Sequence, residues 1–456
     1  MLKSSIRALL PPSLLRAYHR TLAALAAWWY GYPSRRLTVI GVTGTNGKST
    51  VVSLIARVLE ATGHRGGATS TVLFQIGSRT WLNDRKMTML GRFALQAFLR
   101  RMVRAGCTHA VIETSSEGIV QSRHRGIDYD VAVFTNLTPE HIESHGSYDA
   151  YRDAKLELFR HVRRSRKRNP VAVVNLDDAE AGRFLAAGPS RRVGFSTGHP
   201  TAPLQGIETF FAREIRLTPS GSTFTVEGVP FRLQLLGRFN VENALAAIAV
   251  CAAEGIDLER IAAALADVAG VPGRLEFIDT GQQYRVIVDY APEPVSLTKS
   301  YEVLAALPHR RIIHVLGSTG GGRDRARRPV LGRIAAEHAD TVIVTNEDPY
   351  DDDPQEIIDQ VAAGAAGAGK VSGETLHTFA DRRDAIRFAL RQAGEGDIVF
   401  ITGKGSEQAM AVARGKKVPW DDRKVVRELL NEEFKMQKEK FETRNSKSEG
   451  NPKYDI

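Results

Sequence analysis

A glycine-rich turn between a predicted strand and a predicted helix constrains this chain more than any other feature. Residues 37–42 are apolar and β-prone, residues 49–59 have helical spacing, and the turn Thr43-Gly44-Thr45-Asn46-Gly47-Lys48-Ser49-Thr50 joins them. Glycines let backbone N–H groups approach phosphate oxygens, and the helix N-terminus adds positive potential. We expect Lys48 to reach the β and γ phosphates of a nucleotide and Ser49 to coordinate Mg²⁺. The strict P-loop pattern has glycine at position 42, where this chain has Val42, so the turn is a variant P-loop.

Apolar strands alternate with longer helical stretches from residue 37 onward. This alternation favours a parallel sheet with helices on both faces, so the expected fold class is α/β. A break at residues 270–274, with two glycines and a proline, separates a P-loop central domain, residues 37–272, from a smaller doubly wound C-terminal domain, residues 273–430. Short β-type segments within residues 207–234 predict a small antiparallel appendage on the central domain. Strands are expected at 37–42, 109–113, 130–136, 170–175, 286–289, 311–316, 341–345 and 398–402.

The two ends of the chain differ from the rest in composition. Residues 1–36 contain six basic and no acidic side chains, and between Pro12 and Pro33 they have the pattern of a basic amphipathic helix. Its apolar stripe is expected to pack onto the next domain, which is the simpler interpretation, or to lie in the interface of an anionic membrane. Residues 431–456 are charged and contain few core formers, so we expect a disordered tail or a frayed helix. The stripe consists of Leu14, Tyr18, Leu22, Leu25 and Trp29.

Charge and cysteine content exclude several classes of protein. The net charge of +10 indicates an anionic partner but does not choose among nucleotide, nucleic acid and membrane. The basic run at residues 163–168 has no interleaved aromatic residues, so we expect a solvated loop and no nucleic-acid partner. Two cysteines exclude a disulfide scaffold and fit a reducing compartment. The uncharged run 21–34 is too short to span a bilayer, and no signal cleavage site follows it. We therefore expect a cytoplasmic protein, with peripheral membrane contact as the alternative role of its N-terminal helix.

Candidate metal ligands follow two of the predicted strands. Glu113 ends the strand 109–113, and a carboxylate at the carboxyl end of a parallel strand beside a P-loop is well placed to hold a metal. A plain strand-end glutamate is the alternative. His141 and His145 are four residues apart, which indicates a metal pair or simple surface residues. Sequence pattern alone predicts that Lys155 is an ordinary helix lysine.

Nine segments of the chain resemble a known family. Those of the central domain are similar to the central domain of the Mur ligases, ATP-dependent amide-forming enzymes of peptidoglycan assembly. Those of the C-terminal domain resemble the branch that adds the third residue, the UDP-MurNAc-tripeptide synthetases (MurE). The resemblance covers about residues 37–430 in the order of the family. The segments are 43–50, 134–146, 151–159, 236–244, 270–274, 289–291, 323–329, 346–354 and 402–407.

The resemblance implies a reaction and a set of site residues. Mur ligases phosphorylate a substrate carboxylate with ATP, and an amine then attacks the acyl phosphate. Two Mg²⁺ sites are implied, with Ser49, Glu113, His141 and Lys155 as ligands, and Lys155 would then be carbamylated. Lys48, Glu113, His141 and Lys155 form the implied catalytic set. The further implied contacts are Asn240, Arg274 and Asp289 to ATP, Thr88, Ser115 and Arg123 to the acceptor, and Arg323, Asp348, Tyr350, Gly403 and Glu407 to the incoming amino acid.

Four departures from the family pattern concern the substrates. The N-terminal domain that grips the UDP group in this family is absent from the sequence, so a lipid-linked acceptor, or one held by a separate protein, becomes an alternative. Tyr350 stands where diaminopimelate enzymes have arginine. Burying the distal carboxylate of diaminopimelate without that cation would cost several kcal/mol, so lysine, ornithine or another diamino acid is favoured. Pro292 and Glu117 replace two histidines that are usual in the family.

Two other functions remain open at this point. A related ligase could act on a different acceptor, as folylpolyglutamate and cyanophycin synthetases do. Alternatively, the chain could be a non-catalytic protein that binds nucleotide, which is a different functional class. Because Lys48, Glu113, His141 and Lys155 are all present, the sequence favours the enzyme.

Overall fold

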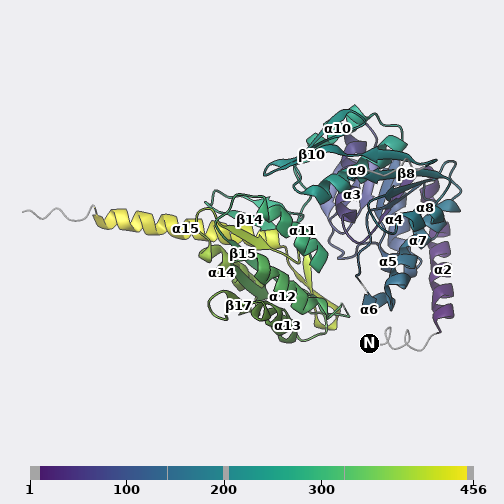
Figure 1. The fold of residues 1–456 in the computed structure, drawn as a ribbon. Helices are drawn as coiled ribbons and strands as arrows, with labels where there is room; N and C mark the ends of the chain where they lie inside the picture. Colours follow the sequence, from purple (N-terminus) through teal and green to yellow (C-terminus); the bar gives the residue numbers. More distant parts are fainter. Residues whose placement is uncertain (1–10, 141, 199–204, 323, 449–456) are drawn as a thin grey trace, which may run out of the picture. The chain divides into compact units, whose positions relative to one another are not determined.

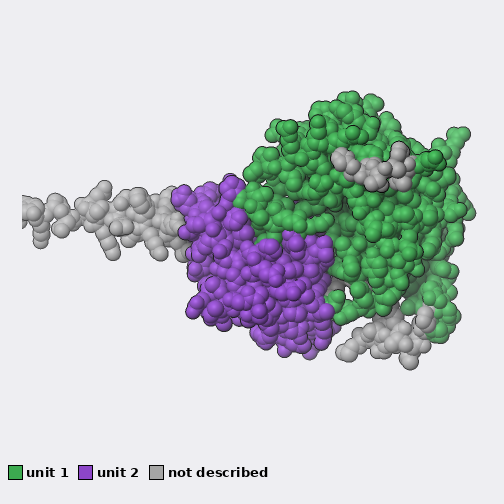
Figure 2. Space-filling model, viewed as in Figure 1, with its two compact units in different colours: residues 1–271, 299–307, 322–324 green, residues 272–298, 308–321, 325–456 purple. Residues whose placement is uncertain are grey.

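The computed structural model describes residues 11–140, 142–198, 205–322 and 324–448 (Figure 1). The chain divides into two compact units, coloured in Figure 2. Unit 1 comprises residues 1–271, 299–307 and 322–324, and unit 2 comprises residues 272–298, 308–321 and 325–456. The fold is α/β, as the sequence predicts, with a large, mainly parallel sheet in unit 1 and a smaller one in unit 2.

The described part of unit 1 contains a nine-stranded sheet in the order β4-β3-β2-β5-β1-β6-β7-β8-β9. All neighbours are parallel except the pairs β2–β3 and β3–β4. The strands are β1 (Thr38–Thr43), β2 (Gly66–Thr69), β3 (Leu73–Ile76), β4 (Arg79–Leu82), β5 (His109–Glu113), β6 (Val131–Phe134), β7 (Val171–Asn175), β8 (Arg191–Ser196) and β9 (Glu208–Phe211).

Helices cover both faces of this sheet (Figure 1). On β1, Ile40 and Val42 pack with one group of helices, and the alternate residue Val39 packs with the other. Both faces are therefore buried, which explains the continuous apolar run of this strand. The first group is α3 (Lys48–Ala61), α9 (Arg238–Ala253) and α10 (Leu258–Ala266), and the second is α4 (Arg92–Arg104), α7 (Tyr148–Arg163) and α8 (Ala181–Ala187). The short helices α5 (Ser116–Val120) and α6 (Ile142–His145) lie between β5 and α7 in sequence.

The antiparallel appendage is present, with a corrected boundary. It consists of β10 (Arg213–Thr218), β11 (Gly221–Val226) and β12 (Val229–Leu233). The segment 208–211, expected to belong to it, is instead the edge strand β9, parallel to β8. Phe210 of β9 is buried in the same core as Phe195 of β8. The sequence pattern of a four-residue strand does not indicate which sheet the strand joins.

The N-terminal helix α2 (Pro12–Trp29) corrects the expectation that its apolar stripe packs onto the next domain. Tyr18 is 56% exposed and Trp29 is 68% exposed. The buried face consists of His19, Ala23, Ala26 and Ala27, and α2 packs against α4. The small alanines allow a close approach to the backbone, since a Cβ added to Gly126 would lie 2.7 Å from Ala27 Cβ. No helix in the described part of the chain is both long and apolar enough to span a bilayer.

Unit 2 is built on a sheet in the order β13-β14-β18-β15-β16-β17, in which only the pair β13–β14 is antiparallel. Its helices α14 (Arg382–Gln392) and α15 (Asp422–Ser448) share a core with the sheet. The strands are β13 (Glu276–Ile278), β14 (Arg285–Val288), β15 (Ile312–Leu316), β16 (Thr341–Thr345), β17 (Leu376–Phe379) and β18 (Ile398–Ile401). The other elements are α12 (Arg327–His338), α13 (Pro354–Gly367) and the hairpin β19 (Ala409–Val412) and β20 (Lys416–Pro419); α11 (Pro294–Ala305) is divided between the units.

Helix α15 continues to Ser448 and so includes much of the segment for which a disordered tail or a frayed helix was expected, in agreement with the helix alternative. Glu, Lys, Met and Gln are strong helix formers, so a charged segment with few core residues can extend a helix that packing has already nucleated.

Candidate active site

The glycine-rich turn lies at the carboxyl end of β1, between β5 and β6. Two of its glycines leave no space for a side chain. A Cβ on Gly44 would lie 1.9 Å from Thr135 Oγ1, and a Cβ on Gly47 would lie 2.1 Å from Asn243 Oδ1. Both have positive φ, 151° and 81°, which L side chains rarely adopt. The turn is therefore a tight backbone cradle that opens helix α3, the arrangement that binds phosphate.

The two residues that directly follow β6 fix this cradle from outside. The amide of Thr45 donates to Asn136 O at 2.8 Å, and the amide of Asn46 donates to Asn136 Oδ1 at 2.8 Å. Thr135 Oγ1 donates to Asn46 O at 2.7 Å. Residues some 90 positions apart in sequence thus hold the same loop.

Glu113 is 2% exposed at the end of β5 and accepts three hydrogen bonds. Ser49 Oγ donates at 2.8 Å, Thr71 N at 2.7 Å and Thr71 Oγ1 at 3.1 Å. These donors are hydroxyl and amide groups, so they leave the negative charge of the carboxylate in place. Thr71 Oγ1 also forms a hydrogen bond of 3.0 Å with Thr88 Oγ1, which links a predicted acceptor-binding residue to the same group.

Two lysines reach the phosphate loop from different elements. Lys48 Nζ donates to Thr45 O at 2.6 Å, and Lys155 Nζ, from α7, donates to Gly44 O at 2.7 Å. Lys155 Nζ also lies 4.3 Å from the centre of the Tyr151 ring. Burial and the nearby charge of Lys48 hold the pKa of Lys155 well below its ordinary value, while Glu140 and Glu113 raise it. Lys155 is consequently a buried amine beside the candidate phosphate site, unlike the ordinary helix lysine that its pattern predicts.

The oxygen atoms of this site fit Mg²⁺. Ser49 Oγ and the Glu113 carboxylate lie 2.8 Å apart, and both are hard oxygen ligands of the kind that Mg²⁺ prefers. Among the described side chains, no group of three His, Cys, Asp or Glu residues forms a metal cluster. The predicted ligand His141 lies outside the described residues. His145 bonds Ser116 Oγ through Nε2 at 3.1 Å, and burial lowers its pKa.

The other predicted ligand contacts of unit 1 have structural partners. Asn240 Nδ2 donates to Leu236 O at 2.8 Å and its Oδ1 accepts from Asn243, which is the residue packed against Gly47. Ser115 caps α5 by accepting from Gly118 N at 3.2 Å. Arg123 donates to Met89 O, next to Thr88. Ser115 and Arg123 lie on the segment that follows β5, which ends at Glu113. Thr88 is linked to Glu113 through Thr71.

Unit 2 carries the remaining predicted contacts. Asp289 accepts from the amides of Leu275 and Tyr290 at 3.1 and 2.8 Å. The Arg274 guanidinium lies 4.3 Å from the centre of the Tyr290 ring. Asp289 therefore holds the residue that follows Arg274, and Arg274 in turn contacts the residue that follows Asp289.

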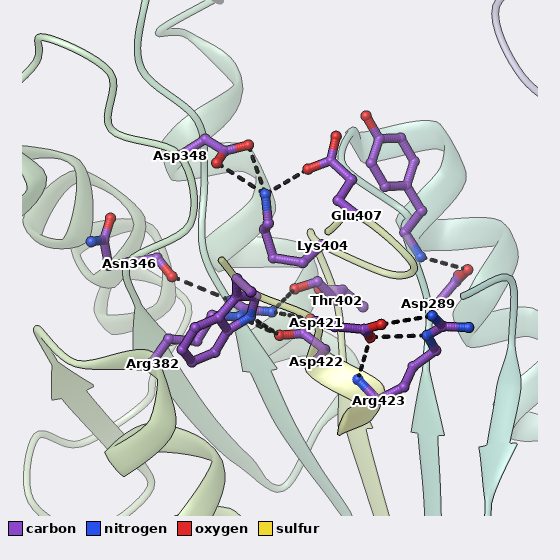
Figure 3. Close-up of polar contacts among 12 residues, drawn as sticks. Asp289, Asn346, Asp348, Arg382, Thr402, Lys404, Glu407, Asp421, Asp422 and Arg423 are labelled. Atoms are coloured by element: carbon purple, nitrogen blue, oxygen red, sulfur yellow. Dashed lines mark hydrogen bonds and ion pairs between the residues drawn. The ribbon is translucent and has the colours of Figure 1, made fainter. Parts of the chain in front are cut away.

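The predicted amino-acid residues gather at the carboxyl ends of β16 and β18 (Figure 3). Lys404 Nζ donates to both Asp348 oxygens at 2.9 Å, to Glu407 Oε2 at 2.5 Å and to Ala409 O at 2.9 Å. Its side chain is fully buried. We call Asp348, Lys404 and Glu407 the acidic triad, since two carboxylates share one ammonium.

Three more residues border the acidic triad. Gly403 has φ 107°, and a Cβ there would lie 2.3 Å from Glu347 Oε2. Tyr350 is in the left-handed region, with φ 53°, and its amide donates to Ala411 O at 3.1 Å. Burial and the charge of Asp348 raise the pKa of Glu347 to about 7, against the opposing charges of Arg382, Lys404 and Arg327. Arg323 lies outside the described residues.

Sequence reasoning missed three polar residues of these sites. Thr71 follows β2 with no motif around it, so nothing in the local pattern indicates its contact with Glu113. Lys404 stands between two glycines directly after a strand, a signal similar to that of Lys48, and could have been found. Glu347 directly precedes Asp348, and its burial depends on the glycine at position 403.

Two family models match the chain. The Mur ligase middle domain matches residues 42–251, and the Mur ligase, glutamate ligase domain matches residues 273–405. Together they include every candidate site residue described above except Glu407.

Curated relatives extend this similarity over most of the chain. A UDP-N-acetylmuramyl-tripeptide synthetase of Roseiflexus sp. (strain RS-1) is 42% identical over 425 residues, which are 90% of this chain and 82% of the relative. A UDP-N-acetylmuramoyl-L-alanyl-D-glutamate--2,6-diaminopimelate ligase of Geobacillus kaustophilus (strain HTA426) is 39% identical over 431 residues, which are 92% of this chain and 84% of the relative.

Solved structures agree in fold. The structure of a UDP-N-acetylmuramoyl-L-alanyl-D-glutamate--2,6-diaminopimelate ligase matches with 31% identity and a TM-score of 0.59, covering 91% of this chain and 83% of that one. A Mycobacterium tuberculosis folylpolyglutamate synthase matches with 20% identity and a TM-score of 0.65, covering 84% and 92%, a likeness of fold alone.

Proposed function

This chain belongs to the Mur ligase family and is an ATP-dependent acid–amino-acid ligase of peptidoglycan precursor synthesis, and we propose that it adds a diamino acid such as lysine to a muropeptide-type acceptor. The observation that carries the ATP-dependent step is the backbone cradle with Lys48, Ser49 and Glu113 around it. We assign ATP to the central domain, residues 37–272, and the amino acid to the C-terminal domain, residues 273–430.

The proposed reaction has two steps. The acceptor carboxylate attacks the γ-phosphorus of ATP, which gives an acyl phosphate and ADP. The α-amine of the incoming amino acid then attacks the acyl carbon, the bond to phosphate breaks, and the amine loses a proton. Lys48 and the N-terminus of helix α3 would stabilise the charge on the transferred phosphoryl group. Because an acyl phosphate hydrolyses readily, the site must also exclude water.

Ser49 and Glu113 would hold Mg²⁺, which when bound supplies further neutralisation of phosphate charge. We propose that Lys155 is carbamylated, with CO₂ adding to its neutral amine and one proton leaving. The depressed pKa of Lys155 favours the neutral amine that this addition requires. The product is an anionic oxygen ligand beside the phosphate loop, which would supply part of a second Mg²⁺ site together with His141.

The choice of a diamino acid rests on charge. Asp348 and Glu407 place two carboxylates around the ammonium of Lys404. A distal ammonium would be attracted to these carboxylates, whereas the distal carboxylate of diaminopimelate would be repelled by them. Tyr350 provides no positive charge in compensation.

The first test is amino-acid-dependent release of phosphate from ATP and Mg²⁺. Lysine, ornithine and diaminopimelate are each compared with a UDP-linked and a lipid-linked muropeptide acceptor. Turnover with lysine or ornithine, and little with diaminopimelate, is expected. Preference for diaminopimelate would overturn the diamino-acid assignment, and no phosphate release with any muropeptide would favour a different acceptor, as in folylpolyglutamate synthases.

We also propose that α2 contacts an anionic membrane. Five large apolar side chains of this helix are exposed, namely Leu14, Tyr18, Leu25, Trp28 and Trp29. Trp and Tyr favour membrane interfaces, and residues 1–36 carry only positive charge.

Flotation with vesicles containing anionic lipid tests the membrane contact. The variant Trp28→Ser/Trp29→Ser should bind less than the wild type, because both side chains are more than 60% exposed and contribute little to folding. Leu217→Ser, at an exposed position of β10, is the matched control and should bind normally. Equal binding of all three proteins would contradict the proposal.

A further inference from the structure

A buried ion pair lies beneath the acidic triad, at residues that the sequence analysis does not single out (Figure 3). Arg382 opens α14 and Asp422 opens α15. Arg382 Nε donates to Asp422 Oδ1 and Arg382 Nη2 to Asp422 Oδ2, both at 2.8 Å, and both side chains are 0% exposed. Trp420 Nε1 also donates to Asp422 Oδ1, at 2.8 Å. This bidentate geometry fixes the orientation of the guanidinium.

The remaining donors of Arg382 point at two main-chain carbonyls. Nη2 donates to Thr402 O at 2.6 Å, and Nη1 donates to Asn346 O at 3.4 Å. Thr402 directly precedes Gly403 and Lys404, and Asn346 directly precedes Glu347 and Asp348. We call residues 346–350 and 402–407 the triad loops, because they carry all three members of the acidic triad.

The two carbonyls directly follow strands that are not neighbours in the sheet. Because β15 lies between β18 and β16, the hydrogen-bond ladders of the sheet do not join the two triad loops directly. Strands that are two apart in a sheet lie roughly 10 Å apart. Arg382 contacts a carbonyl of each loop, while Lys404 connects Asp348 to Glu407.

We infer that the Arg382–Asp422 pair positions the two triad loops, and thereby sets the affinity for the incoming amino acid. The inference rests on the proposed function, since it takes the triad to be the amino-acid site. Arg382 touches no reacting atom in this account and is a positioning residue.

A second ion pair at the other end of β18 provides a matched control. Asp397 directly precedes β18, and its side chain is 0% exposed. It accepts from Arg310 at 2.9 and 3.0 Å and from Arg311 at 2.9 and 3.1 Å. Asp397 is thus buried and doubly paired on the same strand, yet it lies at the amino end, away from the triad loops.

The test compares Arg382→Met/Asp422→Asn with Asp397→Asn, each as the full-length chain. Replacing both members of a buried pair avoids leaving an unpaired buried charge. In the double variant we expect KM for the amino acid to rise about tenfold or more, because small misplacements of binding groups are costly. KM for ATP should stay within about twofold. Asp397→Asn should lower the melting temperature but leave both KM values unchanged.

Unchanged KM for the amino acid in a folded double variant would overturn the inference, as would an equal rise in Asp397→Asn. If the double variant does not fold, Arg382→Lys replaces it. That variant keeps the charge but loses the planar fork, and a smaller rise in KM for the amino acid alone is expected.

A wild type that releases no phosphate with any amino acid would count against the proposed function and not against the positioning. Hydrogen exchange then decides the inference. Faster exchange within residues 346–350 and 402–407 in the double variant, but not in Asp397→Asn, supports it. Equal exchange in the two variants overturns it.

Discussion

The candidate phosphate site of unit 1 and the acidic triad of unit 2 both lie at the carboxyl ends of parallel strands, but they are held by different means. In unit 1 the backbone defines the shape, because Gly44 and Gly47 are closely packed and the amides of Thr45 and Asn46 are fixed by Asn136. In unit 2 buried charges define it, through Lys404 within the triad and Arg382 beneath it. A rigid backbone cradle at a helix N-terminus fits any phosphate, whereas a set of buried charges selects a ligand by its own charge.

The largest effect is expected from Lys48→Met. The cradle would keep its shape, since glycine packing and main-chain bonds define it, but the charge on the phosphoryl group would lose its stabilising partner. Activity should fall by about 10²–10³-fold, as for removal of one donor from a catalytic anion site. Phosphate release under saturating substrates measures this.

Lys167→Met is the control for that variant. Lys167 donates to Leu37 O and pairs with Asp130 at 3.0 Å, at the amino end of the same sheet. The variant Lys167→Met should lower stability slightly and leave the turnover rate unchanged. A similar loss of activity in both variants would mean that Lys48 acts through folding and not through its charge at the phosphate.

A large effect on the activity of the wild type is also expected when CO₂ is removed from the buffer. Because carbamylation is reversible, activity should decline in CO₂-free buffer and return when bicarbonate is added. Lys155→Met should be inactive in both buffers. Activity that is independent of bicarbonate in the wild type, or substantial activity in Lys155→Met, would contradict the carbamate and leave Lys155 as a buried neutral amine.

The two sites also differ in how much of each the sequence could predict. The phosphate turn is one contiguous motif, so the strand, the glycines, Lys48 and Ser49 could all be predicted from the sequence. Glu113 could be predicted from its place at the end of a strand. Asp348 and Glu407 were predicted only through the family resemblance, and Lys404, Glu347 and the Arg382–Asp422 pair were not found. Those residues come from distant segments that only the register of the sheet brings together. The same limit applies to β9, whose partner strand no local pattern indicates, and to α2, whose buried face consists of alanines and a histidine.

A smaller effect, on selectivity, is expected at position 350. Tyr350→Arg would place a cation beside the triad, where it can pair with the distal carboxylate of diaminopimelate. Because Tyr350 already has φ 53°, the substitution introduces no new backbone strain. The ratio of kcat/KM for diaminopimelate to that for lysine should rise about tenfold or more, equivalent to one charge-assisted hydrogen bond.

The conservative variant Tyr350→Phe is the control for this change and should keep the preference for lysine. Lowered kcat/KM for both amino acids in Tyr350→Arg, without a change in their ratio, would show that charge at this position does not select the ligand.

The smallest effect is expected from the pH dependence of stability. The pKa of Glu347 is raised to about 7 from an ordinary value of 4.5, by burial and by Asp348. Between these values the folded state binds more protons than the unfolded state, so stability falls as pH rises through this range and levels off above about pH 8.

Glu347→Gln removes the titrating group and keeps a neutral side chain against Gly403, so its melting temperature should depend less on pH between about pH 5 and pH 8. Burial and Arg382 lower the pKa of His314 to about 3, so His314 makes stability rise with pH up to about pH 6.5, but it does so equally in both proteins and cancels in their comparison. Thermal unfolding of both proteins across this range checks the expectation, and parallel curves would show that Glu347 is ionised in the folded protein. That result would place one more negative charge beside the acidic triad, and so sharpen the contrast with the neutral hydroxyl and amide donors around Glu113 in unit 1.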